Sequence, residues 1–418
     1  MIHRRFSKLK ALFFVCAANL VLVFVIITYY DFRKSSQFRK PFFSDRLDIS
    51  LDGRHYIQRD TRCTPKKNVV FLKTHKTGSS TITNILHRYG EKHDLIFALP
   101  AEGKNRLGWP WFFQQNHVKQ YNVTPNILCS HARYNKAVLT SLMPNDTVYV
   151  TILRDPVTQF ESTFSYMNFG ELLGISNESD ALKTFLDKPK EVLVDYVLTK
   201  DLRVYSDRVK LIRNGMFFDL GLESKDFENK NRIADSIKDL ESQFDLVMLM
   251  EHFDESLVLL RRLLCWEPND VLYFHLNQRQ DVHKRVRLPE KLARKIRQWS
   301  GADVILYDHF RKVFHKKISQ ETGDFHSEIQ GLRFKNQYIQ HMCLDSQKSQ
   351  QGEFNPETKG FIIRRNITTA MKNTCDRMAW DEIRYQKFLK KKQDVMLRRK
   401  QSWWNNMWRR LVTIYHPV

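Results

Sequence analysis

One stretch of the sequence, residues 68–90, most constrains the fold. It reads NVVFLKTHKTGSSTITNILHRYG, and the short apolar run Val69–Leu72 predicts a buried parallel strand. A basic, hydroxyl-rich loop follows, and apolar residues at helical spacing then lead to Gly90, a residue type common at helix C-termini. A strand, a tight loop and a helix N-terminus form an anion site, because backbone N–H groups and the helix dipole point at the ligand. The simpler alternative is a βα turn whose serines cap the helix.

The overall charge also points to an anionic partner. The chain has 418 residues and a formal net charge of +22. Nucleic acid, a membrane surface and a phosphate- or sulfate-bearing ligand are all compatible with this charge. With 42% hydrophobic and 27% charged residues, most of the chain is expected to be globular. Its length allows one sizeable domain with appendages.

The N-terminal region has the pattern of a membrane anchor. Residues 11–30 carry no charge and follow a short segment rich in Lys and Arg. This length suits a transmembrane helix, and the basic flank favours a cytoplasmic N-terminus. We therefore expect a cytoplasmic tail at residues 1–10, a signal-anchor helix at 11–30 and a lumenal stem at 31–62. A cleaved signal peptide is the alternative, although the apolar segment is long for one.

Glycosylation signals and cysteine usage agree with a secretory-pathway lumen. Sequons occur at Asn122, Asn145, Asn177 and Asn366. One of the six cysteines lies in the apolar segment, and the others are widely spaced, without the CxxC or Cys/His spacing of zinc sites. The five remaining cysteines leave at least one without an intramolecular partner. Proximity in the sequence is the only reason to suggest a Cys343–Cys375 pair.

The middle of the chain alternates between predicted strands and helices. Apolar runs at residues 126–129, 147–153, 245–250 and 271–276 predict strands. Alternation of this kind predicts an α/β fold with a mostly parallel central sheet and helices on both faces. We expect the folded domain to span residues 63–345.

Residues 346–418 differ from the domain and are expected to form a basic, aromatic helical extension. Trp403, Trp404 and Trp408 lie among lysines and arginines. This composition fits an interfacial helix on a membrane surface. It fits equally well a helix whose tryptophans pack on the domain, and the sequence does not choose between the two.

Three predicted strand ends carry residues suited to anion chemistry. They are Lys76–Thr81, then His131, and then Arg154 with Ser162 on the following helix. Ligands bind at the carboxyl ends of strands in such sheets, so these residues are expected to meet. The loop lacks the Gly-x4-Gly-Lys-Ser/Thr spacing, which disfavours a nucleoside triphosphatase or ordinary kinase. The chain also lacks Asp-x-Asp, a pair that many glycosyltransferases use to hold a metal and nucleotide sugar.

These motifs resemble those of Golgi sulfotransferases. The stretches LKTHKTGSST and TILRDPVTQFESTF resemble the phosphosulfate- and 3′-phosphate-binding motifs, and ILCSHARYN, NGMFFDLGL and EHFDESLVLLRRLLCW resemble the galactose 3-O-sulfotransferase family in particular. The resemblance covers residues 63 to at least 279. It implies a P-loop-like sulfotransferase fold and 3′-phosphoadenosine-5′-phosphosulfate (PAPS) as sulfate donor, with no metal.

The resemblance also implies an acceptor and a location. Sulfate would go to the 3-hydroxyl of a terminal β-galactose on a glycolipid or glycan. The chain would be a single-pass type II protein of the Golgi membrane with a lumenal catalytic domain. The implied partners are the acceptor and the membrane; nucleic acid is not one, and a homo-oligomer is compatible with the family.

Roles for individual residues follow from the resemblance. Lys76 would contact the phosphosulfate and stabilise the leaving phosphate. Arg154 and Ser162 would hold the 3′-phosphate, Arg154 by forked contact. His131 is the candidate general base, with His75 and Glu161 as rivals. The 5′-phosphate would be wrapped by Thr77, Gly78, Ser79, Ser80 and Thr81.

Two other classes of function stay open at this point. One is another nucleotide-dependent Golgi transferase, such as a glycan kinase or a glycosyltransferase. The other is a non-catalytic binder of acidic glycans or lipid that uses the positive charge. The sequence does not distinguish galactosylceramide from galactose-terminated N- or O-glycans as acceptor.

Overall fold

The computed structural model describes residues 63–176, 180–199, 206–276, 288–345, 350–351 and 359–415. The expected tail, transmembrane helix and stem lie outside this range, as does Asn177. Among the described residues, no helix combines the length and apolar character needed to cross a membrane. Gln58–Val418 form one compact unit.

A four-stranded parallel sheet lies at the centre of the described chain. Its order is β2-β1-β3-β4, with β1 at Val69–Leu72, β2 at Ile127–Leu128, β3 at Val148–Leu153 and β4 at Leu246–Leu249. Every residue of the four strands is buried. Full burial is expected of a parallel sheet covered on both faces, and it accounts for continuous apolar runs in place of alternation. These strands confirm four of the five predicted runs, all except residues 271–276.

The predicted strand at residues 271–276 is wrong. Pro268–Val271 form a 3-10 turn, and the residues that follow it belong to no strand. Side chains satisfy this backbone in place of a neighbouring strand: Asn336 Oδ1 accepts from the N–H of Tyr273 at 3.0 Å, and Thr81 Oγ1 accepts from that of Leu276 at 3.2 Å. The segment is nevertheless largely buried, so its apolar pattern reports burial without a strand.

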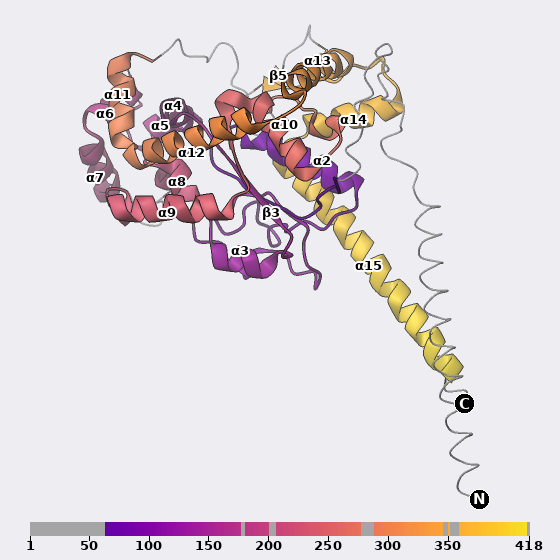
Figure 1. Cartoon of the computed structure of the whole chain (residues 1–418). Coiled ribbons are helices and arrows are strands. Elements are labelled where there is room, and N and C mark those ends of the chain that lie inside the picture. Colours follow the sequence, from indigo (N-terminus) through magenta and orange to yellow (C-terminus); the bar gives the residue numbers. More distant parts are fainter. Residues whose placement is uncertain are drawn as a thin grey trace, which may run out of the picture. The chain divides into compact units, whose positions relative to one another are not determined.

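Helices cover both faces of the sheet (Figure 1). After β1 comes α2 (Ser79–Lys92), after β3 comes α4 (Pro156–Tyr166), and after β4 comes α10 (Phe253–Leu264). β4 contacts α10 and also α12 (Gly301–Gln320). α12 in turn contacts α8 (Gly215–Asp219). The α/β architecture with a parallel central sheet is therefore confirmed.

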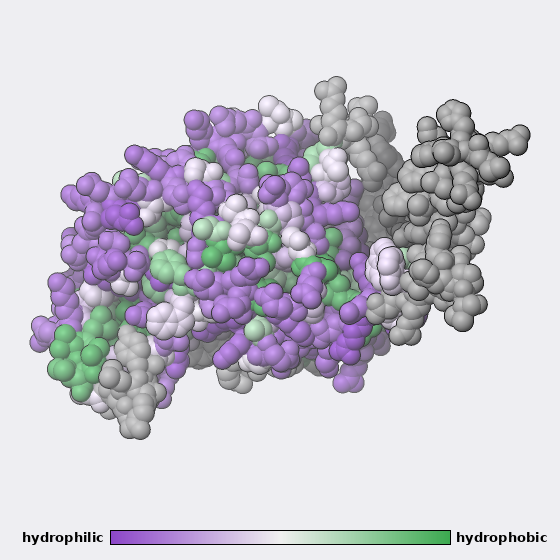
Figure 2. All heavy atoms as spheres, turned by 90° about the horizontal axis from the view of Figure 1, so that it is seen from below, coloured by the Kyte–Doolittle hydropathy of each residue, from purple (hydrophilic) through white to green (hydrophobic). Residues whose placement is uncertain are grey.

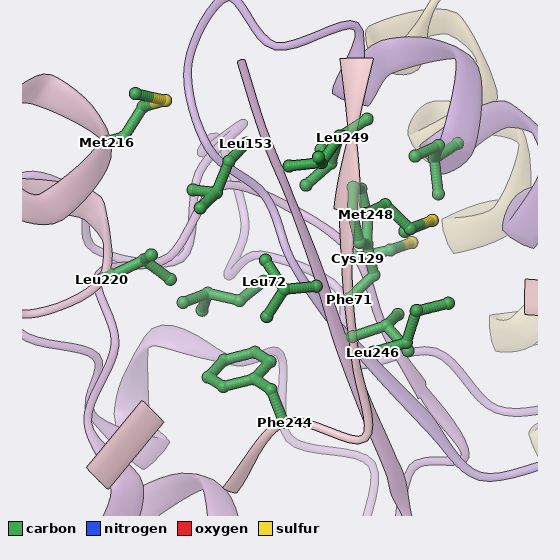
Figure 3. Close-up of a cluster of buried hydrophobic side chains, with 14 of the residues drawn as sticks. Phe71, Leu72, Cys129, Leu153, Met216, Leu220, Phe244, Leu246, Met248 and Leu249 are labelled. Carbon is green, nitrogen blue, oxygen red and sulfur yellow. The ribbon is translucent and has the colours of Figure 1, made fainter. Parts of the chain in front are cut away.

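Buried side chains from several elements meet around the sheet (Figure 3). Leu72, Met216 and Leu220 are among them, and all three are almost fully buried. Cys129 and Met248 belong to the same core. Each strand therefore contributes to one continuous apolar core, which fixes the positions of the strand ends.

The remaining elements complete the described chain. They are α3 (Lys136–Leu142), α5 (Phe169–Leu172), α6 (Ala181–Asp187), α7 (Pro189–Thr199), α9 (Lys230–Gln243), α11 (Glu290–Trp299), α13 (Phe325–Cys343), α14 (Thr369–Ala379), α15 (Glu382–Tyr415) and the antiparallel pair β5 (Gln350–Gln351) and β6 (Lys359–Gly360). The face shown in Figure 2 is mostly hydrophilic, with apolar side chains in small groups.

The C-terminal helices α14 and α15 pack on α2. The Asn84 side chain on α2 donates to the carbonyls of Arg377 and Trp380, at 2.8 and 3.0 Å, where α14 gives way to α15. Further along, Gln393 accepts from the N–H of Phe97 at 3.0 Å and donates to its carbonyl at 3.2 Å. The first half of α15 is therefore held on the domain by side-chain to main-chain bonds.

Two disulfides join distant parts of the described chain. Cys343 pairs with Cys375, which confirms the pair suggested by proximity. Cys63 pairs with Cys265, 202 residues later. Cys129 is buried and free, in agreement with the expectation of at least one unpaired cysteine.

Candidate active site

A cavity of about 630 Å³ gathers most of the predicted site residues. Its volume lies within the range of roughly 300–1,000 Å³ that is usual for ligand pockets. Its lining includes Lys76, Gly78, Ser79, Ser80, Thr81, His131, Arg154 and Ser162. The rival bases His75 and Glu161 line it as well, whereas Thr77 does not. The loop after β1 and the ends of β2 and β3 therefore meet at one site, as predicted.

The N-terminus of α2 has the geometry of an anion site. Gly78 is its N-cap residue, with φ of 76°, a left-handed conformation that favours glycine. Within the described chain, no side chain caps this helix and its first turn contains no acidic residue. This excludes the alternative in which serines cap α2. The N–H of Thr81 bonds to the Gly78 carbonyl at 3.1 Å. The N-terminus of α2 lies at the positive end of the helix dipole, which stabilises an anion bound there.

Several loop hydroxyls bond within the protein. The hydroxyl of Thr77 bonds to that of Thr74 at 2.8 Å and donates to its carbonyl at 3.2 Å. Ser79 Oγ donates to the same carbonyl at 2.7 Å. The Thr81 hydroxyl accepts the backbone bond described above. These side chains shape the loop, so backbone N–H groups are its main donors to an anion.

Two cations of the predicted motifs are linked directly. Arg154 Nη1 donates to the carbonyl of Lys76 at 3.1 Å, and Arg154 Nε donates to Thr158 Oγ1 at 3.1 Å. Lys76 has a φ of 62°, an uncommon value for a residue with a side chain, and its Nζ lies 3.4 Å from the centre of the Tyr166 ring. The two motifs are therefore parts of one site, with Arg154 bonded to the unusual turn at Lys76.

His75 is oriented by a buried carboxylate that the sequence reasoning missed. Asp219 Oδ2 lies 2.8 Å from both the backbone N and the ring Nδ1 of His75, while Asp219 Oδ1 accepts from Trp109 Nε1 at 2.8 Å. These bonds assign the proton of neutral His75 to Nδ1, which leaves Nε2 as an acceptor. Nε2 is buried and has no hydrogen-bond partner among the described residues. The only sequence signal for Asp219 was its place in the stretch NGMFFDLGL.

His131 stacks on His75, with ring centres 4.0 Å apart and planes 16° apart. Burial places the pKa of His131 well below its usual value, and the charges of His75 and Lys73 lower this pKa further. Two imidazole rings this close do not both become positively charged readily. The carboxylate lies on His75, so this geometry favours His75 as the proton acceptor of the pair.

A second missed group reaches the site from α15. Lys73 is buried, lines the cavity and pairs with Glu382 at the start of α15. Its Nζ also lies 3.4 Å from Ser80 Oγ. Gln386, one turn further on, donates to Glu382 Oε1 at 3.1 Å and to Ser130 Oγ at 3.0 Å. No local pattern could have indicated Glu382, which is 309 residues from Lys73.

Helix α11 also lines the cavity. It contributes Glu290 and Arg297, which form an ion pair at 3.1 Å. Among the described residues, no group of three or more His, Cys, Asp or Glu could hold a metal ion. The sequon residues that the structure describes, Asn122, Asn145 and Asn366, are all exposed.

Comparison with known proteins gives a consistent result. The profile of the galactose-3-O-sulfotransferase family matches residues 5–393. Galactosylceramide sulfotransferase of Mus musculus is 36% identical over 342 residues, which cover 77% of this chain and 78% of that protein. Galactose-3-O-sulfotransferase 2 of Sus scrofa is 35% identical over 343 residues, covering 77% and 83%. Galactose-3-O-sulfotransferase 3 of Mus musculus is 34% identical over 345 residues, covering 78% of each.

Proposed function

This chain belongs to the galactose-3-O-sulfotransferase family, and we propose that it transfers sulfate from PAPS to the 3-hydroxyl of a terminal β-galactose. One observation carries the proposal. A helix N-terminus, two cations and a carboxylate-oriented imidazole line one cavity or its edge. This combination can hold a phosphorylated donor and accept a proton from a hydroxyl group.

The donor is proposed to bind along the cavity wall made by the first two motifs. The first-turn amides of α2 and the Lys76 ammonium would hold the 5′-phosphosulfate. Arg154 and Ser162 would hold the 3′-phosphate, since the guanidinium fork suits phosphate oxygens. PAPS, when bound, supplies a sulfuryl group with a phosphate as leaving group. The positive charge of Lys76 would stabilise the negative charge that develops on that phosphate.

His75 is proposed as the general base, in preference to His131. Its Nε2 would take the proton from the galactose 3-hydroxyl, and Asp219 would stabilise the resulting imidazolium while holding the ring in place. Asp219 is a positioning residue in this scheme, because it acts through His75. His131 would stay neutral and pack against the ring of the base. Glu161 also lines the cavity.

The location and fold type are also proposed. We infer a P-loop-like sulfotransferase fold and a Golgi type II topology, with residues 11–30 as anchor. The two disulfides support a lumenal domain, since disulfides persist in oxidising compartments. The acceptor is proposed to be a galactose-terminated glycolipid, such as galactosylceramide, or a galactose-terminated glycan. No metal is required in this scheme.

The test uses the purified full chain and labelled PAPS. Transfer should be measured to galactosylceramide, to N-acetyllactosamine and to a core-1 glycan. We expect Lys76→Ala and Arg154→Ala each to lower kcat/KM about 100-fold or more, as loss of a preorganised charge at a transition state does. Lys316→Ala, which removes an exposed lysine of α12, is the matched control and should be neutral. Unchanged rates in both site variants would refute the site.

A binding measurement separates this proposal from the other two classes. Adenosine 3′,5′-bisphosphate should raise the melting temperature of the chain. Stabilisation by a nucleoside triphosphate or a nucleotide sugar alone would indicate a kinase or glycosyltransferase. Retention on heparin without any nucleotide effect would indicate a non-catalytic binder.

A further inference from the structure

Helix α15 has one face that is buried on the domain in its first half. Tyr385, Leu389 and Gln393 are all buried and follow one another at intervals of four residues. Tyr385 donates to Glu91 of α2, and Gln393 bonds to the backbone of Phe97 as described above. The orientation of α15 about its own axis is therefore fixed.

The same face continues beyond the domain as a row of tryptophans. Five helical turns take about 18 residues, so Trp403 lies directly along the helix from Tyr385, and Trp404 from Gln386. Trp408 follows Trp404 by about one turn. These three side chains are 39%, 55% and 67% exposed. The apolar face thus continues where the described residues no longer cover it.

The end of the covered region is well defined. Asp394 still forms an ion pair with Lys119 of the domain, at 3.0 Å. From Arg398 onward, nearly every side chain whose burial is described is exposed. The family match also ends at residue 393, so the tryptophan face lies outside the part of the chain that the family profile covers. The catalytic fold therefore does not account for it.

The charge beside the tryptophans selects the partner. Arg398, Arg399 and Lys400 are exposed and lie within one to two helical turns before the first two tryptophans. Between residues 395 and 415 the sequence contains no Asp or Glu. Exposed tryptophans whose only charged neighbours on the helix are basic fit the boundary of an anionic bilayer, where indole rings lie at headgroup depth and cations meet lipid charges.

We propose that the segment from Arg398 to Trp408 is a membrane-binding helix that lies on the surface of an anionic bilayer. The tryptophans enter the headgroup region, and the basic residues contact anionic lipid headgroups. This contact is separate from the expected anchor at residues 11–30, and it does not depend on the identity of the sulfate acceptor. Because the first half of α15 is bonded to the catalytic domain, this contact would hold the domain in one orientation relative to the membrane.

The test places the full chain in lipid nanodiscs that contain brominated phosphatidylcholine, with or without phosphatidylserine. Brominated lipid quenches only tryptophans that enter the bilayer. The chain has 8 tryptophans, so we expect up to about three-eighths of the fluorescence to be quenched, and more strongly with phosphatidylserine. The triple variant Trp403→Ser, Trp404→Ser, Trp408→Ser should lose this quenching. Trp111→Ser removes a tryptophan that is 71% exposed elsewhere and should leave the quenching unchanged.

A second variant and a fold check keep the result unambiguous. Replacing Arg398, Arg399 and Lys400 by Glu should abolish the extra quenching caused by phosphatidylserine. Stabilisation by adenosine 3′,5′-bisphosphate should persist in both variants, which shows that the domain is folded. Equal quenching in the wild type and the tryptophan variant would overturn the proposal. So would a dimer in detergent that the tryptophan variant converts to a monomer, because the face would then bind a second copy.

Discussion

Replacing Asp219 with Asn tests the orientation of the proposed base. Asp219 accepts from three donors, two on His75 and one on Trp109, within a fully buried setting. An asparagine has one carbonyl oxygen and an NH₂ group, so at least one of these donors would face another donor. A buried unsatisfied group costs about 1–3 kcal/mol, and a hydrogen bond to a charged group contributes about 1.5–3 kcal/mol. If the second contribution acts on the transition state, kcat should fall about 10- to 150-fold.

The assay is the initial rate of sulfate transfer, with separate measurement of kcat and of KM for PAPS. KM for PAPS should change little, because the substitution leaves Lys76 and Arg154, which are proposed to hold PAPS, in place. Trp109→Phe is the matched control: it removes one donor to Oδ1 and leaves both His75 contacts on Oδ2. Its kcat should stay within a few-fold of wild type. A folded Asp219→Asn protein with kcat within twofold of wild type would refute the argument, and so would equal losses in the two variants.

Three further predictions concern stability. Burial lowers the pKa of His87 from 6.5 to about 3, so below pH 6.5 the unfolded chain binds a proton at this residue that the folded chain does not. From pH 7 to pH 5, His87 alone should lower the free energy of unfolding by about 2 kcal/mol, and His87→Phe should remove that part of the pH dependence in urea titrations. Glu382→Gln should lower the free energy of unfolding by about 3–5 kcal/mol, because it leaves the Lys73 ammonium buried without its carboxylate. Adding Lys73→Met to this variant should restore much of the lost free energy in the same titrations. Replacing Cys63 and Cys265 with Ser should lower the unfolding free energy by up to about 5 kcal/mol, because the bond closes a loop of 202 residues; no change in the denaturant midpoint would contradict this.

The parts of the site that are local in sequence were predictable from it. The strand, the loop and helix α2 follow one another within residues 68–92, so an apolar run and a helical period were enough to place the anion site. Arg154 was predictable for the same reason, because it directly follows a strand of clear β-branched character. These features depend on short-range patterns and on one general rule about strand ends.

The residues that support the site were not predictable in this way. Asp219 orients His75 from 144 residues away, and Glu382 pairs with Lys73 across 309 residues. An acidic residue within an apolar stretch has no local signature that names its partner. The prediction of a strand at 271–276 failed for a related reason. Burial gives this segment the apolar composition of a strand, while distant side chains form the hydrogen bonds of its backbone.

The ion pair between Lys73 and Glu382 has a consequence for synthesis of the protein. The loop that holds Lys73 is made early, but its partner carboxylate leaves the ribosome only after 309 further residues. At about 5–20 residues per second, that interval lasts on the order of 15–60 s. During this time the buried lysine position has no counter-charge, so no nascent chain or C-terminal truncation that stops before Glu382 can complete the donor pocket. A message cut short upstream of Glu382 would yield a protein that lacks this ion pair.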